Sequence, residues 1–196
     1  MNAMLLPAMQ FRAWLRVEDF LLLQNSGAFA DGRKAELIEG ELLAINAQFV
    51  RHAYAKSLLH LAIDRGLRAA GSDLVAVIEA SVAMPPFDLP EPDIVIAAVP
   101  LQGGPVPVGT VALLIEVADT TQRFDLGRKA FVYARSRVPE YWVVDLAAKS
   151  IVRHWGPDTA GYAHTDSIPL GASIASLTID GLTVATDALL GLPETD

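Results

Sequence analysis

Three charged residues in separate segments of the chain could together hydrolyse a phosphodiester bond. Asp93 comes directly after Pro92 at the start of an apolar run, and Glu116 lies within the apolar stretch LLIEVADTT, residues 113–121. Lys129 follows within a helical pattern. An ionised carboxylate that is buried without a partner costs on the order of several kcal/mol, so Glu116 requires a counter-charge. A divalent cation shared with Asp93 would provide it and would also relieve the repulsion between the two carboxylates.

The ligand chemistry of this set indicates Mg²⁺, or Mn²⁺ in its place. Both cations accept oxygen ligands, and the chain has no cysteine for a thiolate site. The four histidines are His52, His60, His154 and His164. Their spacing matches no histidine-rich zinc motif. A lysine beside the cation and a phosphate could orient the attacking water or stabilise charge on the phosphoryl oxygens. Tyr133 lies four residues beyond Lys129 on the same helix face and could position this lysine or close the site.

Each of these residues also has a purely structural interpretation. Asp93 could cap a strand or turn, Glu116 could pair with a buried lysine or arginine, and Lys129 could be a solvated helix residue. The occurrence of all three, in this order and on these elements, favours the catalytic interpretation.

The elements that must position these residues are predicted to form a mixed α/β sheet with helices on its faces. The core comprises a helix over 50–70, strands over 74–82, 93–99 and 111–117, a helix over about 125–136 and a strand over 140–146. A helix between the third and fourth strands predicts that those two strands are parallel. The first three strands are joined by loops and can therefore run antiparallel.

Further elements flank this core. We expect a short amphipathic helix over 14–24, a hairpin around Glu39-Gly40, a strand over 150–155 and a tail with a short strand and a final helical turn. The prediction is one domain over 1–196, divided into an N-terminal helix and hairpin at 14–46, a core at 50–146 and a C-terminal β extension at 150–192.

Composition limits the classes of function. Fifteen Lys and Arg residues stand against 23 Asp and Glu residues, which gives a net charge of −8 and argues against generic high-affinity coating of nucleic acid. A small local basic patch or a divalent cation remains compatible with this charge. No apolar stretch predicts a membrane span, and we expect no signal peptide. The absence of cysteine is consistent with the reducing cytoplasm, which is the expected location.

Six segments occur in the order typical of the Uma-two family of predicted restriction endonucleases. They are KAELIEGELLAI, RHA, PEPDIVIA, LLIEVADTT, DLGRKAFVYARSRVPEYWVVD and IDGLTV. The resemblance covers roughly residues 15–190, and the family is similar in fold to the PD-(D/E)xK nuclease superfamily with its αβββαβ core. It implies that Asp93 is the first acid and Glu116 the second. The usual lysine, two residues after the second acid, is replaced by Ala118, and the resemblance implies that Lys129 takes its role.

The resemblance also implies auxiliary residues. Glu36 and Glu41 in the hairpin match the family pattern, and Glu41 is preferred because it leads directly into the core helix. Alternation along the hairpin cannot decide which acid faces the site. His52, at the start of the core helix, could contact a phosphate, hydrogen-bond an acid or have no chemical role. Four arginines near Lys129 could form either a local basic patch or a solvated helix face: Arg123, Arg128, Arg135 and Arg137.

The expected function is therefore a Mg²⁺- or Mn²⁺-dependent endonuclease that hydrolyses phosphodiester bonds in DNA. Asp93, Glu116 and Glu41 would hold the metal, and Lys129 would act on the water or the phosphate. The alternative is a catalytically inactive module on the same fold that binds a nucleic acid or another protein. Hydrolysis of another phosphoester cannot be distinguished from DNA cleavage at this level. A homodimer is suggested by analogy of fold alone.

Overall fold

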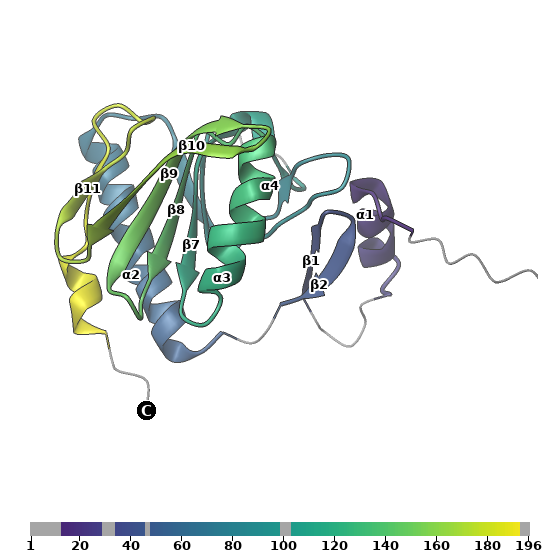
Figure 1. The fold of residues 1–196 in the computed structure, drawn as a ribbon, viewed down its shortest axis with the longest axis horizontal. Coiled ribbons are helices and arrows are strands. Elements are labelled where there is room, and N and C mark those ends of the chain that lie inside the picture. Colours follow the sequence, from purple (N-terminus) through teal and green to yellow (C-terminus); the bar gives the residue numbers. More distant parts are fainter. Residues whose placement is uncertain (1–12, 29–33, 46–47, 99–102, 193–196) are drawn as a thin grey trace, which may run out of the picture.

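The computed structural model describes residues 13–28, 34–45, 48–98 and 103–192. Its centre is a six-stranded sheet (Figure 1). In spatial order the strands are β10 Gly161–Pro169, β9 Ser150–Asp158, β8 Glu140–Asp145, β7 Val111–Ala118, β5 Ile94–Ala97 and β3 Val75–Ile78. The helical segments are α1 Val17–Asn25, α2 Val50–Ala69, η1 Val108–Thr110, α3 Gln122–Phe124, the π-helix η2 Asp125–Lys129, α4 Ala130–Arg135 and η3 Asp187–Gly191.

The connectivity of the sheet confirms the predicted core. β3 pairs antiparallel with β5, and β5 pairs antiparallel with β7. The chain then crosses through α3, η2 and α4 and returns as β8, which is parallel to β7. β9 and β10 extend the sheet antiparallel beyond β8. A helix between two neighbouring parallel strands is the expected crossover, since a tight turn cannot connect them.

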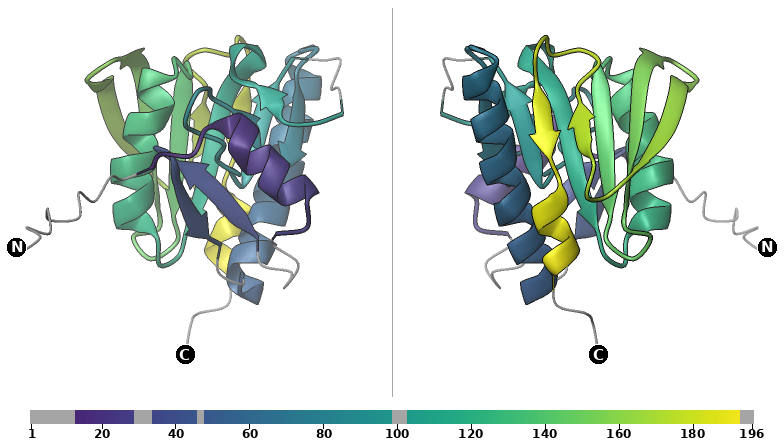
Figure 2. Two further views of the ribbon diagram at one scale, coloured as in Figure 1. Left: turned by 90° about the vertical axis from the view of Figure 1, so that its right-hand side faces the viewer. Right: turned by 90° about the vertical axis from the view of Figure 1, so that its left-hand side faces the viewer.

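The two faces of the sheet are covered by different helices. On one face, α2 and the C-terminal segment pack against alternate strand residues such as Ile94, Ile115 and Trp142. On the other face, α4 packs against the intervening residues, among them Leu114 and Val143. Figure 2 shows α2 and the C-terminal segment on one side and the N-terminal hairpin on the other. Strand β7 is apolar along nearly its whole length because both of its faces are buried.

The N-terminal hairpin forms where the sequence predicted it. β1 Ala35–Ile38 pairs with β2 Glu41–Ala44, and both residues of the connecting turn, Glu39 and Gly40, have positive φ values of 53° and 75°. Positive φ at both central residues is the requirement of a type I′ hairpin turn. Leu37 of the hairpin is fully buried in a cluster with α1.

The structure differs from the predicted elements in three places. The predicted strand over 74–82 ends early, because Glu79 has a φ of 52° that no extended strand accommodates. Its last residue instead begins β4 Val82–Ala83, which pairs with β6 Val106–Pro107. β10 was not predicted, since its sequence GYAHTDSIP has no regular apolar alternation. The tail forms a two-stranded sheet from β11 Ser173–Ala175 and β12 Thr183–Ala185. Within the described ranges, no helix is both long and apolar enough to cross a membrane.

Candidate active site

The pairing of β5 with β7 brings the two predicted acids together. Ile94 lies opposite Ile115, so the next step of this antiparallel register places Asp93 opposite Glu116. The main-chain N–H of Val117 donates a hydrogen bond of 2.8 Å to Asp93 Oδ2. Both acids line a cavity of about 640 Å³. The second and third core strands are therefore neighbours, which is the condition for the two carboxylates to approach each other.

Glu116 is 5% exposed, and the structure shows its counter-charge. Its Oε1 accepts a hydrogen bond of 3.0 Å from Lys129 Nζ and one of 2.7 Å from the Tyr133 hydroxyl. The pKa of Glu116 is raised to about 8, foremost because of burial. The neighbouring acids Asp125, Asp93 and Glu36 contribute to this rise, and the Lys129 ammonium opposes it. The site therefore holds more negative charge than its lysine neutralises.

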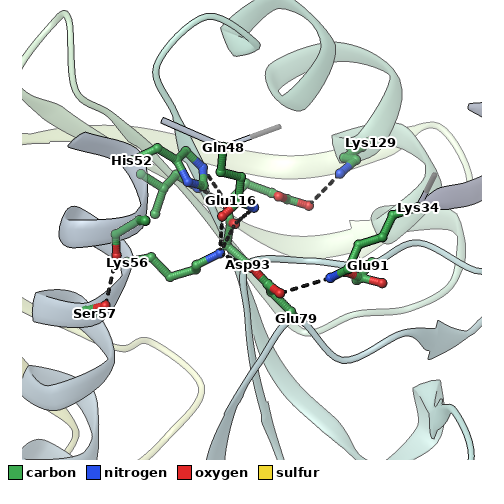
Figure 3. A network of polar contacts seen from close by, with 12 residues as sticks. Lys34, Gln48, His52, Lys56, Ser57, Glu79, Glu91, Asp93, Glu116 and Lys129 are labelled. Carbon is green, nitrogen blue, oxygen red and sulfur yellow. Dashed lines mark hydrogen bonds and ion pairs between the residues drawn. The ribbon is translucent and has the colours of Figure 1, made fainter. Parts of the chain in front are cut away.

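Lys129 is a buried cation shared by two acids. It is 6% exposed, and its Nζ lies 3.0 Å from Glu116 Oε1 and 3.2 Å from Glu36 Oε2. Burial disfavours its ammonium, but Glu116, Glu36 and Asp125 outweigh burial and raise the pKa of Lys129. Figure 3 shows its side chain directed toward Glu116. Lys129 is thus a charged residue of the cavity and not a solvated helix residue.

Asp93 is held by side chains from α2. His52 Nε2 lies 3.2 Å from Asp93 Oδ2, and Lys56 Nζ lies 3.4 Å from Asp93 Oδ1. Burial disfavours the ionised Asp93, but the hydrogen bond and charge of His52, the Val117 N–H and the charge of Lys56 prevail. The pKa of Asp93 is therefore lowered, and the site contains one readily ionised acid beside one that retains its proton.

Sequence reasoning missed two residues of this site. Lys56 is 4% exposed on α2, and Asp125 is 3% exposed at the start of the π-helix. Lys56 precedes Leu59 and Ile63 by three and seven residues, so a lysine at a core position of the helix was a usable signal. Burial raises the pKa of Asp125, while Lys129 and the Thr121 hydroxyl oppose the rise. Nothing in the local sequence distinguished Asp125 from an exposed helix acid.

The π-helix and the α-helix that continues it direct three side chains toward the same buried region beside Glu116. Asp125, Lys129 and Tyr133 follow one another at four-residue intervals along η2 and α4, and all three are buried. Residues four apart share a helix face, so the chain presents an acid, an amine and a hydroxyl toward Glu116. Single π turns inside α-helices occur frequently at functional sites.

The two hairpin acids separate in space, and Glu36 lines the candidate cavity, whereas the preferred Glu41 lines a different one. Glu36 lies opposite Leu43 and Glu41 opposite Ile38, so the acids occupy different levels along the hairpin. Glu36 is 6% exposed, lines the cavity and contacts Lys129. Glu41 lies beside the turn, where it contacts Arg128 at 2.8 Å and lines a different cavity. The position along the hairpin, and not the face, decides between them.

The arginines near Lys129 do not form a free basic patch. Arg128 contacts Glu39 and Glu41, and Arg135 contacts Glu39 and Asp88. Among the described lysines and arginines, three have no acid within 4.0 Å: Arg65, Arg123 and Lys149. None of these three lines the candidate cavity. Most of the positive charge is therefore neutralised within the molecule.

The side chains that line the cavity carry the type of ligand atom that a divalent cation binds. Carboxylates of Glu36, Asp93, Glu116 and Asp125 line one cavity, and such oxygens suit Mg²⁺ or Mn²⁺. Within the described part of the chain, no three His, Asp or Glu side chains are already arranged as a metal site. Protein groups contact these oxygens instead, foremost the Lys129 ammonium between Glu36 and Glu116. Cation binding therefore requires a rearrangement of these contacts.

Comparisons with known proteins agree with the fold and with the resemblance noted from the sequence. The profile of the Uma2 family, described as "Putative restriction endonuclease", matches residues 17–187. A crystal structure described as "a putative nuclease belonging to DUF820", from Anabaena variabilis ATCC 29413, is similar with a TM-score of 0.67 and 14% sequence identity. The alignment covers 91% of this chain and 97% of that one, which supports the fold. No curated protein matches the sequence significantly.

Proposed function

The chain belongs to the Uma2 family of restriction-endonuclease-like proteins, and from this premise we propose that it is a Mg²⁺- or Mn²⁺-dependent endonuclease acting on DNA. One observation carries the proposal: Asp93, Glu116 and Lys129 come from three elements and line the same cavity. Two acids that could hold a cation, with a lysine in contact with one of them, are groups suited to metal-assisted phosphodiester hydrolysis.

In this proposal Asp93, Glu116 and Glu36 hold the cation, with Asp125 beside them. When bound, the cation neutralises charge on the phosphoryl group and lowers the pKa of a coordinated water. Asp93 is held ready for this role by the Val117 N–H and His52. The Tyr133 hydroxyl fixes Glu116 Oε1 at 2.7 Å and leaves the second oxygen of that carboxylate for the cavity.

Lys129 then acts on the substrate. With a cation present to balance the charge of Glu116 and Glu36, its ammonium would be able to donate a hydrogen bond to the attacking water or to a phosphoryl oxygen. The raised pKa of Lys129 keeps this group a donor and prevents it from acting as a base at neutral pH. Its role is therefore positioning of the nucleophile and stabilisation of developing negative charge.

The test is cleavage of linear and supercoiled DNA by the purified protein with Mg²⁺ or Mn²⁺, and in EDTA. Lys129→Arg keeps the positive charge that the buried acids require but changes its geometry, so we expect at least about 100-fold slower cleavage with the fold retained. Lys149→Arg is the matched control, because Lys149 is exposed and lies outside the cavity. Undiminished cleavage by Lys129→Arg, or cleavage that persists in EDTA, would contradict the mechanism.

A second candidate function is a non-catalytic module that binds a nucleic acid or a protein. Lys129 and Lys56 are already paired with acids, and most arginines near the site are as well, so few cationic groups are available to a substrate, which favours this function. Calorimetry separates the two proposals. Millimolar Mg²⁺ or Mn²⁺ should bind to the endonuclease, and the absence of any heat of binding would favour the non-catalytic module. A homodimer and a cytoplasmic location stay predictions.

A further inference from the structure

We propose that Lys56, anchored by Glu79, is a positioning residue that fixes the direction in which Asp93 presents its carboxylate to the cavity. This inference rests on the proposed function, since the role of Asp93 as a cation ligand belongs to that function. Asp93 lines the cavity, whereas Lys56 and Glu79 are not among its lining residues. Lys56 reaches the cavity through two of its lining residues, Asp93 and Gln48.

The burial of Lys56 gives the first argument. Its side chain is 6% exposed and lies on the face of α2 that carries the core residues Leu59 and Ile63. Ion pairs in such positions are often no more stabilising than apolar residues of the same volume. Stability by itself therefore gives no reason for a lysine here, and a contact that only an ammonium can make is the better explanation.

The contacts of Asp93 show what this ammonium does. Lys56 Nζ lies 3.4 Å from Asp93 Oδ1, and 2.5 Å from both Glu79 Oε1 and Gln48 Oε1. The other oxygen of Asp93 is held by Val117 N–H and His52. Figure 3 shows Lys56 reaching from α2 toward Asp93, beside Glu79. Gln48 Nε2 donates to the same Oδ1 at 3.4 Å, and Lys56 also contacts Gln48, so Lys56 directly and through Gln48 holds the carboxylate oxygen that the backbone does not.

Glu79 contributes the second argument. Its φ of 52° lies in the left-handed region, which is unfavourable for a residue with a side chain. In this conformation its main-chain N–H donates to the carbonyl oxygen of Asp93 at 3.1 Å, while its carboxylate contacts Lys56 and Lys34. Glu79 therefore reaches Asp93 both through the backbone and through Lys56. Backbone strain retained at such a point is typical of functional sites.

Lys34 offers a matched control. Its ammonium contacts Glu79 Oε2 at 3.0 Å and Glu91 Oε1 at 2.9 Å, but it makes no contact with Asp93. Lys34→Met and Lys56→Met therefore remove the same chemical group from the same glutamate. Only Lys56→Met should disturb Asp93.

The first experiment uses the metal-free protein and does not depend on activity. The amide proton of Val117 donates to Asp93 and reports its position in NMR spectra. We expect Lys56→Met to shift this resonance and to speed its exchange with solvent, and Lys34→Met to leave it as in the wild type. An unchanged Val117 amide in Lys56→Met would overturn the positioning role, whatever the protein binds.

The second experiment measures the affinity for Mn²⁺ by calorimetry. Loss of a residue that orients a metal ligand typically weakens binding about 10- to 100-fold, and we expect this for Lys56→Met against less than about threefold for Lys34→Met. Charge alone predicts the opposite sign, because removal of a nearby ammonium attracts a cation. Unchanged or tighter binding by Lys56→Met would therefore refute the inference.

Glu79→Gln covers the case in which Lys56→Met does not fold. It keeps the side-chain volume but removes the charge that anchors Lys56, so we expect roughly 3- to 10-fold weaker Mn²⁺ binding. Wild-type affinity in folded Glu79→Gln would count against the inference. If the wild-type protein binds no Mn²⁺, the proposed function fails, and the Val117 experiment still decides whether Lys56 positions Asp93.

Discussion

At the scale of single residues, the buried Glu116 is explained by a lysine thirteen residues later in the chain. Lys129 bridges Glu116 and Glu36, so one ammonium contacts two carboxyl groups in a cavity that also holds Asp93 and Asp125. Ion pairing and catalysis are compatible here.

The two hairpin acids give a prediction at this scale. Glu36→Gln removes an acid that contacts Lys129, so we expect about 10- to 100-fold slower DNA cleavage and weaker cation binding. Glu41→Gln changes an acid in the other cavity and should alter cleavage by less than about threefold. Cleavage rates with Mg²⁺ check both variants. If Glu41→Gln proved the more damaging change, Glu36 would lose its place in the site.

At the scale of elements, the site depends on the docking of the N-terminal hairpin against the core. The hairpin delivers Glu36 and is fixed at its turn, where the Gly40 N–H donates to the carbonyl oxygen of Phe87 and Leu15 donates to that of Gly40. Arg128 ties the same turn to the π-helix through Glu39. The hairpin and the helix that carries Lys129 are therefore held together.

Gly40→Ala tests this dependence. A Cβ at Gly40 would lie 2.9 Å from Trp14 Cβ, in a backbone with a φ of 75°. We expect the free energy of unfolding to fall by roughly 2–4 kcal/mol and cleavage to slow, because Glu36 loses its support. The control is Gly27→Ala, with a φ of 77° but no atom within 4 Å of the added Cβ. It should cost about 1–2 kcal/mol and leave cleavage unchanged. Denaturant titration measures both, and equal losses would show that hairpin docking is not involved.

At the scale of the whole molecule, negative charge is concentrated where the cation is proposed to bind. The net charge is −8, and most described arginines and lysines contact acids elsewhere in the fold. Folding therefore forces several carboxylates together without enough positive charge to neutralise them. A protein of this kind should become more stable when it binds a divalent cation.

The raised pKa of Glu116 predicts that the stability of the metal-free protein depends on pH. Its pKa rises from 4.5 to about 8 on folding, so the folded protein retains a proton that the unfolded chain releases. The stability that this proton confers is complete below pH 4.5 and is lost as pH rises through 8. We expect the metal-free wild type to lose on the order of a few kcal/mol relative to Glu116→Gln between about pH 5 and 8.5.

Denaturant titrations in EDTA at several pH values measure this difference. Added Mg²⁺ should restore the stability of the wild type at the upper end of the range, because cation and proton compete for Glu116. It should have a smaller effect on Glu116→Gln. A difference between the two proteins that does not change with pH would show that Glu116 is ionised throughout.

The sequence by itself determined the core of the fold and the identity of the central acids. Apolar periodicity identifies helices and strands because it depends on neighbouring residues only, and a crossover helix fixes β7 and β8 as parallel. Glu116 stands out because it interrupts an apolar strand, and Asp93 because it directly precedes one. The lysine of the site became recognisable through the motif that contains Lys129 and Tyr133.

Only the tertiary structure decided which other side chains reach these acids. Glu36 was separated from Glu41 by its level along the docked hairpin, and Arg128 was neutralised by Glu39, 89 residues away in the chain. Lys56 and Asp125 entered the site through the packing of α2 and the π-helix. Contacts of this kind depend on the placement of whole elements relative to one another, which no local pattern of residue types encodes.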